Sequence, residues 1–172
     1  MGQGQQLQLA SIGEVHELFE ARQVWHLLFG GWAVDFHVGR ITRAHGDVDL
    51  AVKMADLGPI SQLLAVHGWK HVPSEDDDGG TGFVRNAVRL ELTFLEPDAD
   101  GSMFIPLRAG RATWLTDDGA AEVMDLDGTR CRVLPLTVLS AMKGSPRSDP
   151  EDAEKDRADY HVLTQVACSP DT

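Results

Sequence analysis

The sequence contains very little cysteine. Only Cys131 and Cys168 occur among its 172 residues, far apart and without a C-x-x-C partner. Disulfide-stapled folds and zinc knuckles need several cysteines at defined spacings. The sequence therefore excludes both of these classes, and thiol chemistry is not expected.

Long hydrophobic runs are also missing. No apolar stretch approaches the roughly 18–20 residues that a membrane-spanning helix needs, although 42% of the residues are hydrophobic. Residues 1–8 are polar and glutamine-rich, with no basic segment before an apolar one, so they do not resemble a signal peptide. We expect a cytoplasmic protein without a membrane partner, and a short frayed tail over residues 1–8.

Positive charge is scarce. Fifteen Lys and Arg residues face 27 Asp and Glu residues, which gives a formal net charge of −12. Sequence-independent binding of nucleic acid depends on basic surface, so we expect no nucleic-acid partner. An acidic protein suits a small cationic ligand or a metal-chelated nucleotide, although acidity also serves solubility alone.

The order of the segments predicts one α/β (α+β) domain. The spacing predicts a helix over residues 9–21, an apolar strand (24–29) and a second helix (32–38). A strand (47–52) and a third helix (56–67) come next. Hairpins follow at 83–95 and 122–134, separated by a loop-like stretch at 96–110, and two helices close the chain from residue 136. We expect a mixed sheet flanked by helices, with a core over 9–134 and a C-terminal helical segment over 135–172 packed on it.

Two aspartates mark a candidate metal site. Asp47 and Asp49 are separated by one residue on the predicted strand, so their side chains project to the same face while Val48, Leu50 and Val52 project to the other. Carboxylate oxygens at this spacing suit a hard divalent cation that keeps part of its coordination shell for phosphate and water. An isolated Asp-x-Asp is also common as a solvated strand end.

A double glycine precedes the aspartates. Gly30 and Gly31 follow the apolar strand and precede a predicted helix. Such a turn exposes backbone N–H groups at a helix N-terminus, where they can hold a phosphate chain. The combination of a phosphate-holding turn, a helix, a loop and two carboxylates is more specific than either motif alone.

This segment resembles the nucleotidyltransferase superfamily, and within it the small antibiotic nucleotidyltransferases that modify aminoglycosides and lincosamides. The residues that carry the resemblance are Gly30-Gly31-Trp32-Ala33-Val34-Asp35, Gly39-Arg40 and Arg43-x-His45-x-Asp47-Val48-Asp49. It extends more loosely through the strand of Glu91 and the segment Lys155-Asp156-x-x-Asp159. The resemblance implies a mixed sheet flanked by helices and the transfer of a nucleoside monophosphate, AMP from ATP, to a hydroxyl group.

The resemblance also implies roles for individual residues. Asp47, Asp49 and Glu91 would hold Mg²⁺, and Glu91 would take the proton from the acceptor hydroxyl. Glu91 is longer than the Asp of many small relatives; the alternatives are an ion pair of Glu91 with Arg89 or Arg85, and Glu96 as the third carboxylate. Backbone N–H groups of Gly30 and Gly31 would bind the β- and γ-phosphates.

Three further residues have more than one interpretation each. Arg43 either contacts phosphate or is an ordinary loop cation. Lys143 either reaches the triphosphate or complements the dipole at a helix C-terminus. His45 either orients Asp47 or contacts phosphate, or it makes a structural hydrogen bond.

The predicted function is a Mg²⁺-dependent nucleotidyltransferase that uses ATP or another nucleoside triphosphate. Its expected acceptor is a small amine-bearing molecule such as an aminoglycoside or lincosamide antibiotic. Two alternatives remain open: a toxin–antitoxin-type enzyme that modifies a protein, and a catalytically inactive protein that only binds nucleotide. The sequence also leaves a homodimer open.

Overall fold

The centre of the molecule is a mixed β-sheet. The computed structural model describes residues 2–73, 77–114 and 121–167, so Met1 and Cys168 lie outside the described residues. The strands of the main path run in the order β3-β4-β5-β2-β1-β9-β8. The pairs β2/β5 and β1/β9 are parallel and the others are antiparallel. These strands are β1 (His26–Phe29), β2 (Val48–Lys53), β3 (Lys70–His71), β4 (Gly80–Arg85), β5 (Val88–Pro97), β8 (Glu122–Leu126) and β9 (Thr129–Val133).

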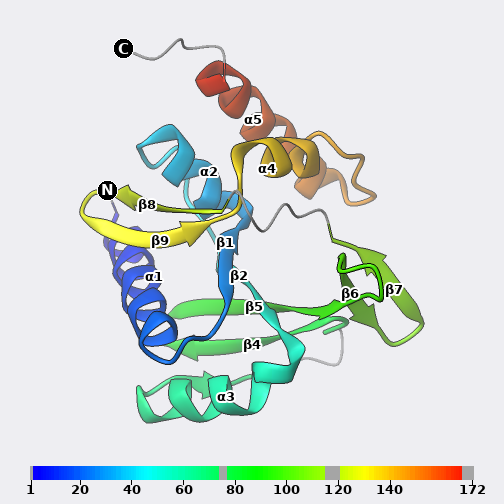
Figure 1. Ribbon diagram of the computed structural model, residues 1–172. Helices are drawn as coiled ribbons and strands as arrows, with labels where there is room; N and C mark the ends of the chain where they lie inside the picture. Colours follow the sequence, from blue (N-terminus) through cyan, green and yellow to red (C-terminus); the bar gives the residue numbers. More distant parts are fainter. Residues whose placement is uncertain (1, 74–76, 115–120, 168–172) are drawn as a thin grey trace.

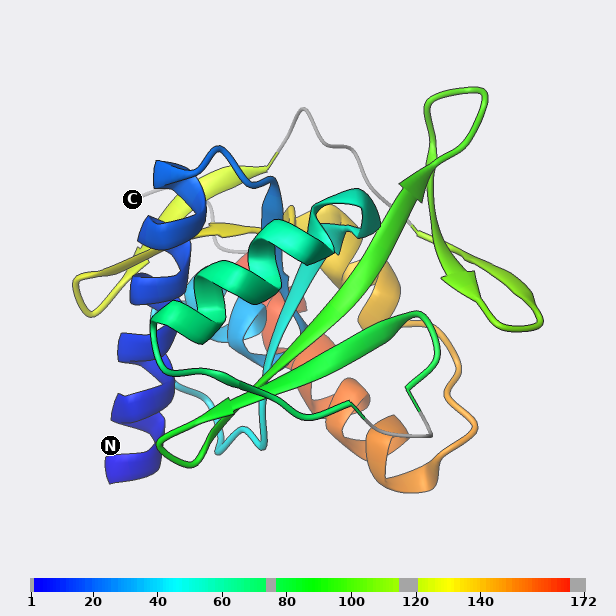
Figure 2. The same ribbon diagram turned by 90° about the horizontal axis from the view of Figure 1, so that it is seen from below.

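Helices cover both faces of this sheet (Figure 1). On one side lie α1 (Gln3–Ala21) and α3 (Leu57–Val66), the latter preceded by a short 3₁₀ turn, Met54–Asp56. On the other side lie α2 (Gly30–Val38), α4 (Leu136–Lys143) and α5 (Pro150–Ala167). The view from below shows α3 in front of the sheet and α5 behind it (Figure 2). The predicted mixed sheet flanked by helices is confirmed.

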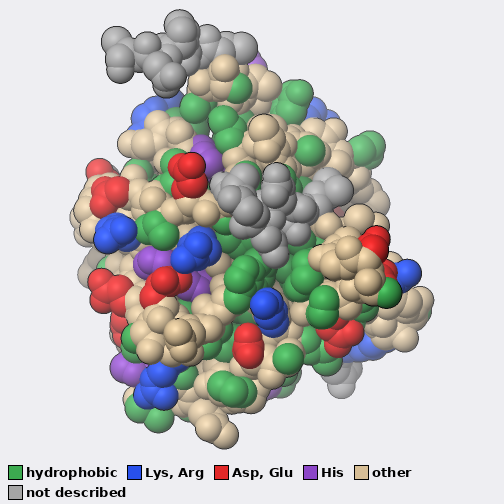
Figure 3. Space-filling model, in the orientation of Figure 1, with side chains coloured by type: hydrophobic (Ala, Val, Ile, Leu, Met, Phe, Trp, Pro, Cys, Tyr) green, Lys and Arg blue, Asp and Glu red, His purple; other side chains and the backbone are tan. Residues whose placement is uncertain are grey.

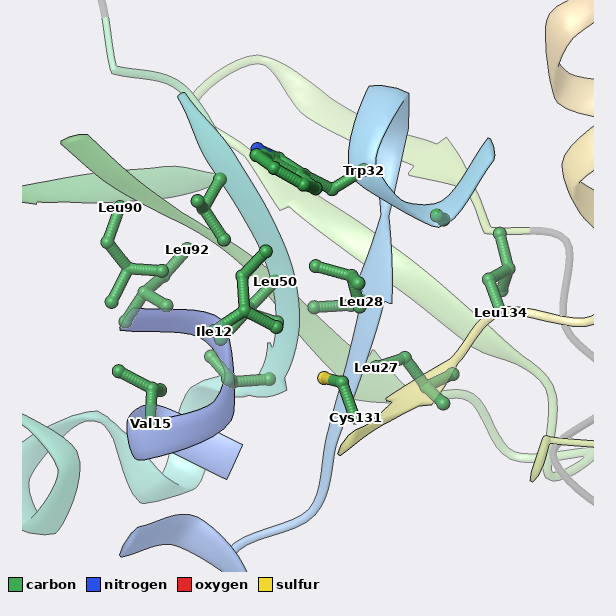
Figure 4. Packing of buried hydrophobic residues seen from close by; sticks show 14 of the residues in the cluster. Ile12, Val15, Leu27, Leu28, Trp32, Leu50, Leu90, Leu92, Cys131 and Leu134 are labelled. Carbon is green, nitrogen blue, oxygen red and sulfur yellow. The ribbon is translucent and has the colours of Figure 1, made fainter. Parts of the chain in front are cut away.

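The predicted alternation along β2 sets the direction of its side chains. Val48, Leu50 and Val52 are almost completely buried. Figure 4 shows Ile12 and Val15 of α1 beside Leu50 in this layer of the core. Burial of one such side chain contributes about 1.5–3 kcal/mol, so the pattern fixes which face of β2 carries its aspartate.

The two predicted hairpins are present. Asn86 and Ala87 join β4 to β5 with φ values of 49° and 65°, and Asp127 and Gly128 join β8 to β9 with 51° and 81°. Consecutive positive φ values are typical of the turn that matches the twist of a two-residue hairpin. Aspartate and glycine suit this conformation, whereas Ala87 adopts it at a steric cost.

The frayed tail predicted for residues 1–8 is wrong for Gln3–Gln8, because α1 begins at Gln3. Gln5 Nε2 donates to the Arg43 carbonyl at 3.0 Å and Gln8 Nε2 donates to the His45 carbonyl at 3.2 Å. These contacts stabilise the extra helical turns and attach them to the loop before β2. The division of the chain at residues 134 and 135 stays a prediction.

The loop predicted for residues 96–110 is also wrong. Strand β5 continues to Pro97, and β6 (Met103–Leu107) pairs with β7 (Gly110–Thr113) in a hairpin that leaves the main sheet. Pro106 is tolerated in β6 because a strand of a two-stranded ribbon has an unpaired edge. In Figure 2 this hairpin projects from the body of the protein.

The surface view in Figure 3 shows acidic and basic side chains interspersed on one face of the protein. No helix within the described ranges is sufficiently long and apolar to cross a membrane.

Candidate active site

A cavity of about 400 Å³ lies where β1, β2 and the C-terminal helices meet. Its lining comes from the start of α2, the loop before β2, and helices α4 and α5. Candidate residues from the sequence that line it are Gly30, Gly31, Arg43, His45, Asp47, Asp49 and Lys143. The fold thus gathers segments that are more than 100 residues apart in the chain.

The two aspartates lie at the start of β2. Asp47 immediately precedes the strand, and Asp49 lies on it, between Phe29 of β1 and Glu91 of β5. Burial, together with the charge of Asp47, raises the pKa of Asp49 to about 7, while Lys143 opposes this shift. Two acids held together in a buried place repel each other, and a divalent cation would relieve that repulsion.

The glycines allow the backbone to approach this carboxylate. Gly30 is the first residue of α2 and has a φ of +69°. A Cβ atom on Gly30 would overlap Asp49 Oδ2, and one on Gly31 would overlap the ring of His45 and lie 2.7 Å from Arg43 Nη2. Within the described residues no side chain caps the N-terminus of α2, so its first N–H groups, at the edge of the cavity, have no side-chain acceptor.

Asp35 shapes the loop that carries Arg43 and His45. Asp35 is completely buried and accepts hydrogen bonds from the backbone N–H and the hydroxyl of Thr42, at 2.9 and 2.6 Å. His45 Nε2 donates to the other oxygen of Asp35 at 2.6 Å. In the neutral ring Nδ1 is then an acceptor for Arg43 Nη1, 3.1 Å away. Of the interpretations left open for His45, the structural hydrogen bond is the one observed.

The cationic side chains of the cavity are paired with acids of α5. Lys143 Nζ lies 2.7 Å from Asp156 and 2.9 Å from Asp159. Arg43 donates two hydrogen bonds to Asp159, at 3.0 and 2.9 Å, and Arg147 Nε donates to Asp156 at 2.8 Å. Both interpretations of Arg43 and Lys143 remain compatible with these contacts, because the paired cations still line the cavity.

Glu91 is beside Asp49 but belongs to a neighbouring cavity. The two residues are register partners in a parallel pair, so their side chains project from the same face of the sheet. Glu91 forms an ion pair with Arg89, which is one of the alternatives considered from the sequence, whereas Arg85 pairs with Glu14. The alternative third carboxylate, Glu96, lies further along β5, opposite Phe104 of β6.

This second cavity, of about 330 Å³, shares Thr93 with the first one. Its acidic lining residues are Glu91, Asp77 and Asp78, and its apolar wall includes Ile105 and Leu107 of the β6–β7 hairpin. Figure 1 shows this hairpin continuing from the end of β5.

Sequence reasoning did not assign functions to Asp35, Thr93 and Arg147. Asp35 could have been recognised because it interrupts the largely apolar stretch 32–38, where a buried carboxylate needs hydrogen-bond partners. Thr93 and Arg147 gave no local signal, because only the packing of β5 and of the segment after α4 brings them to the cavity.

A separate group of potential metal ligands, His16, His26 and Cys131, is buried between α1 and the sheet. His16 Nδ1 and His26 Nε2 are 2.8 Å apart, and His26 Nδ1 donates to the Val24 carbonyl at 3.0 Å. This geometry is that of a hydrogen-bonded pair of neutral rings.

The sheet order, the glycines that open α2 and the paired aspartates at the start of β2 are typical of nucleotidyltransferases. The chain belongs to the aminoglycoside-2''-adenylyltransferase family, whose model matches residues 11–162. It is therefore an enzyme of the nucleotidyltransferase class. A search of curated protein sequences finds no match.

Solved structures show the same fold. The lincosamide antibiotic adenylyltransferase LnuA, crystallised with lincomycin, has a TM-score of 0.68 at 19% identity, covering 89% of this chain and 94% of LnuA. ANT(2'')-Ia in complex with adenylyl-2''-tobramycin has a TM-score of 0.67 at 18% identity, with 94% and 90% covered. An antigenic nucleotidyltransferase-like protein from Paracoccidioides brasiliensis has a TM-score of 0.51 at 12% identity, with 92% and 75% covered.

Proposed function

We propose that this enzyme transfers a nucleoside monophosphate, AMP from ATP, to a hydroxyl group of a small amine-bearing antibiotic such as an aminoglycoside or a lincosamide. The observation that carries the proposal is the pairing of Asp49 with Glu91 across β2 and β5. One carboxylate lines a cavity with cations and a helix N-terminus, and the other lines an acidic cavity that shares Thr93. Such a pair of cavities suits a nucleotide on one side and a cationic acceptor on the other.

The residues of the first cavity fit a Mg²⁺ ion and a triphosphate. Asp47 and Asp49 would supply the oxygen ligands that Mg²⁺ requires. The pKa of Asp49 is raised first by burial and then by the charge of Asp47, and a bound cation would offset both effects. The bound ion would neutralise phosphate charge and orient the triphosphate. The N–H groups at Gly30 and Gly31, with Arg43 and Lys143, would contact the phosphates.

Glu91 is proposed as the general base. Its carboxylate would accept the proton of the acceptor hydroxyl as the oxygen attacks the α-phosphorus, and pyrophosphate would leave. Asp77 and Asp78 would attract ammonium groups of the acceptor, which explains why an acidic cavity adjoins a phosphate site. A homodimer stays a prediction.

The test is pyrophosphate release with Mg²⁺, each of the four nucleoside triphosphates, and a panel of aminoglycosides and lincosamides. We expect acceptor-dependent release, highest with ATP, that disappears when EDTA removes the metal. Asp49→Asn should lower the rate by more than about a hundredfold, because a direct ligand matters more than its supporting contacts. Glu91→Gln should lower kcat by about 10²–10⁴-fold.

Asp125→Asn is the matched control, since Asp125 is exposed in the β8–β9 hairpin. It should retain wild-type activity. Nucleotide transfer to a protein in place of any antibiotic would identify a protein-modifying enzyme. Binding of Mg²⁺ and ATP without turnover with any acceptor would identify a nucleotide-binding protein and refute the proposal.

A further inference from the structure

Five charged side chains from three parts of the chain meet at the edge of the first cavity. Arg43 comes from the loop before β2, Lys143 and Arg147 from α4 and the segment after it, and Asp156 and Asp159 from α5. We call these five residues the α5 cluster. It contains three cations and two acids, so it leaves one surplus positive charge next to a cavity suited to phosphate.

The two acids and Lys143 are the buried members of this cluster. The side chains of Asp156 and Asp159 are 7% and 2% exposed, whereas that of Arg43 is 29% exposed. Burial alone would raise the pKa of Asp159, but hydrogen bonds from Arg43 and Lys143 outweigh it and hold this pKa below its usual value. Both acids therefore lie in the protein interior, each in contact with two cations of the cluster.

The geometry restricts where the cations point. Arg43 donates from Nε and Nη2 to Asp159 and from Nη1 to the Ala44 carbonyl and to His45 Nδ1, which leaves one N–H of Nη2 without a partner. A Cβ on Gly31 would lie 2.7 Å from this Nη2 atom, so the remaining donor is beside the glycines. A guanidinium group held by two parallel bonds has a fixed plane. Lys143 is fixed by contacts to both acids, although a free lysine side chain samples many rotamers.

We infer that Asp156 and Asp159 are positioning residues for the triphosphate of the nucleotide, acting through Lys143 and Arg43. This inference rests on the proposed function. The cations bind phosphate oxygens with the N–H donors that the acids leave unused. The acids hold the side chains of Lys143 and Arg43 in place before the nucleotide binds, so less side-chain entropy is lost on binding. The C-terminal helix α5 thereby contributes to nucleotide affinity without a direct contact to the nucleotide.

The test measures equilibrium binding of Mg²⁺-ATP to Asp159→Asn, Arg43→Gln and the double variant. Each single change should raise the Kd for Mg²⁺-ATP about tenfold. The Kd of the double variant should not exceed that of the single variant with the higher Kd, because the two residues act as a unit. The KM for ATP should rise in parallel, while the KM for the acceptor should not change. Glu154→Gln is the control, as it makes the same charge change on an exposed position of α5.

Thermal unfolding of each variant separates positioning from simple stabilisation. If Asp159→Asn lowers the unfolding temperature but the folded protein binds Mg²⁺-ATP as tightly as wild type, the acids only dock α5 and the inference is refuted. Additive losses in the double variant would refute it as well. Should Asp159→Asn fail to fold, Asp156→Asn provides the same comparison through Lys143, with Lys143→Gln as its partner variant.

Binding of Mg²⁺-ATP to the wild-type enzyme distinguishes failure of the proposed function from failure of the positioning role alone. If wild type does not bind Mg²⁺-ATP at all, the proposed function is refuted, and the positioning role with it. If wild type binds Mg²⁺-ATP and the positioning variants bind it equally tightly, only the positioning role is refuted, and pyrophosphate release still decides the proposed function.

Discussion

Single residues determine how closely the backbone approaches the carboxylates. Gly30 has a positive φ, and a Cβ atom added to it would overlap the carboxylate of Asp49. Gly39 has a similar φ of +73°, at the end of α2, but open space surrounds it. Substitution of Gly39 therefore tests backbone strain alone, whereas substitution of Gly30 tests backbone strain together with a steric clash.

We predict that Gly30→Ala abolishes activity and that Gly39→Ala does not. Both variants should lose about 1–3 kcal/mol of unfolding free energy, because alanine is strained at positive φ. Only the Gly30 variant displaces Asp49, so only it should also lose metal and nucleotide binding. Chemical denaturation and pyrophosphate release measure the two effects, and equal activity of both variants would contradict the role assigned to Gly30.

At the scale of elements, a histidine pair connects α1 to β1. His26 donates from Nδ1 to the Val24 carbonyl, so its Nε2 accepts a hydrogen bond from His16 Nδ1. Burial lowers the pKa of His26 from 6.5 to about 4, although the hydrogen bond to Val24 opposes the shift. Burial also lowers the pKa of His16. The attachment of α1 to the sheet therefore depends on neutral rings.

We predict that acid destabilises the protein through this pair. The folded state binds fewer protons than the unfolded state, so the contribution of His26 is complete above pH 6.5 and decreases as the pH falls towards 4. The slope should reach about 1.4 kcal/mol per pH unit. Urea unfolding of wild type and His26→Gln between pH 7.5 and 4.5 measures it.

The variant should show a smaller pH dependence than wild type over this window. His67→Gln serves as the control, because His67 is exposed after α3. An unchanged slope in His26→Gln would assign the acid sensitivity to other groups.

For the whole molecule, two cavities share Thr93, and the proposed function assigns the nucleotide to one and the acceptor to the other. The cavity proposed for the nucleotide is built from the core sheet and the C-terminal helices, and the cavity proposed for the acceptor uses the β6–β7 hairpin. Gly79 packs tightly against this hairpin, since a Cβ there would overlap Ile105 and lie 3.1 Å from the Pro106 carbonyl. Changes in the β6–β7 hairpin should therefore affect binding of the acceptor and not binding of the nucleotide.

We predict that the double variant Ile105→Ala, Leu107→Ala raises the acceptor KM by roughly tenfold, because it removes apolar wall from a substrate cavity. The KM for ATP should stay unchanged. Steady-state kinetics with each substrate varied in turn checks both values. Thr113→Ala, an exposed change on β7, is the control, and an unaltered acceptor KM would exclude this cavity as the acceptor site.

Much of this architecture was predictable from local patterns. Alternating residues set the direction of Asp49, and turn residues marked both hairpins, because these properties depend on neighbours in the chain. The start of α1 and the β6–β7 hairpin were not predictable. Gln5 and Gln8 are held by a loop more than 35 residues away, and Pro106 is accepted only because its strand has an unpaired edge.

The sequence by itself determined the fold class, the glycine turn and the pair of aspartates, since each depends on short-range spacing and on the fixed periods of strand and helix. Only the tertiary structure decided the environment of these groups. It placed Lys143 and Arg43 on buried acids of α5, assigned His45 to Asp35, and put Glu91 in an adjoining cavity beside Asp49. Charge pairing and cavity boundaries depend on which distant segments pack together, and no local pattern in the chain encodes that choice.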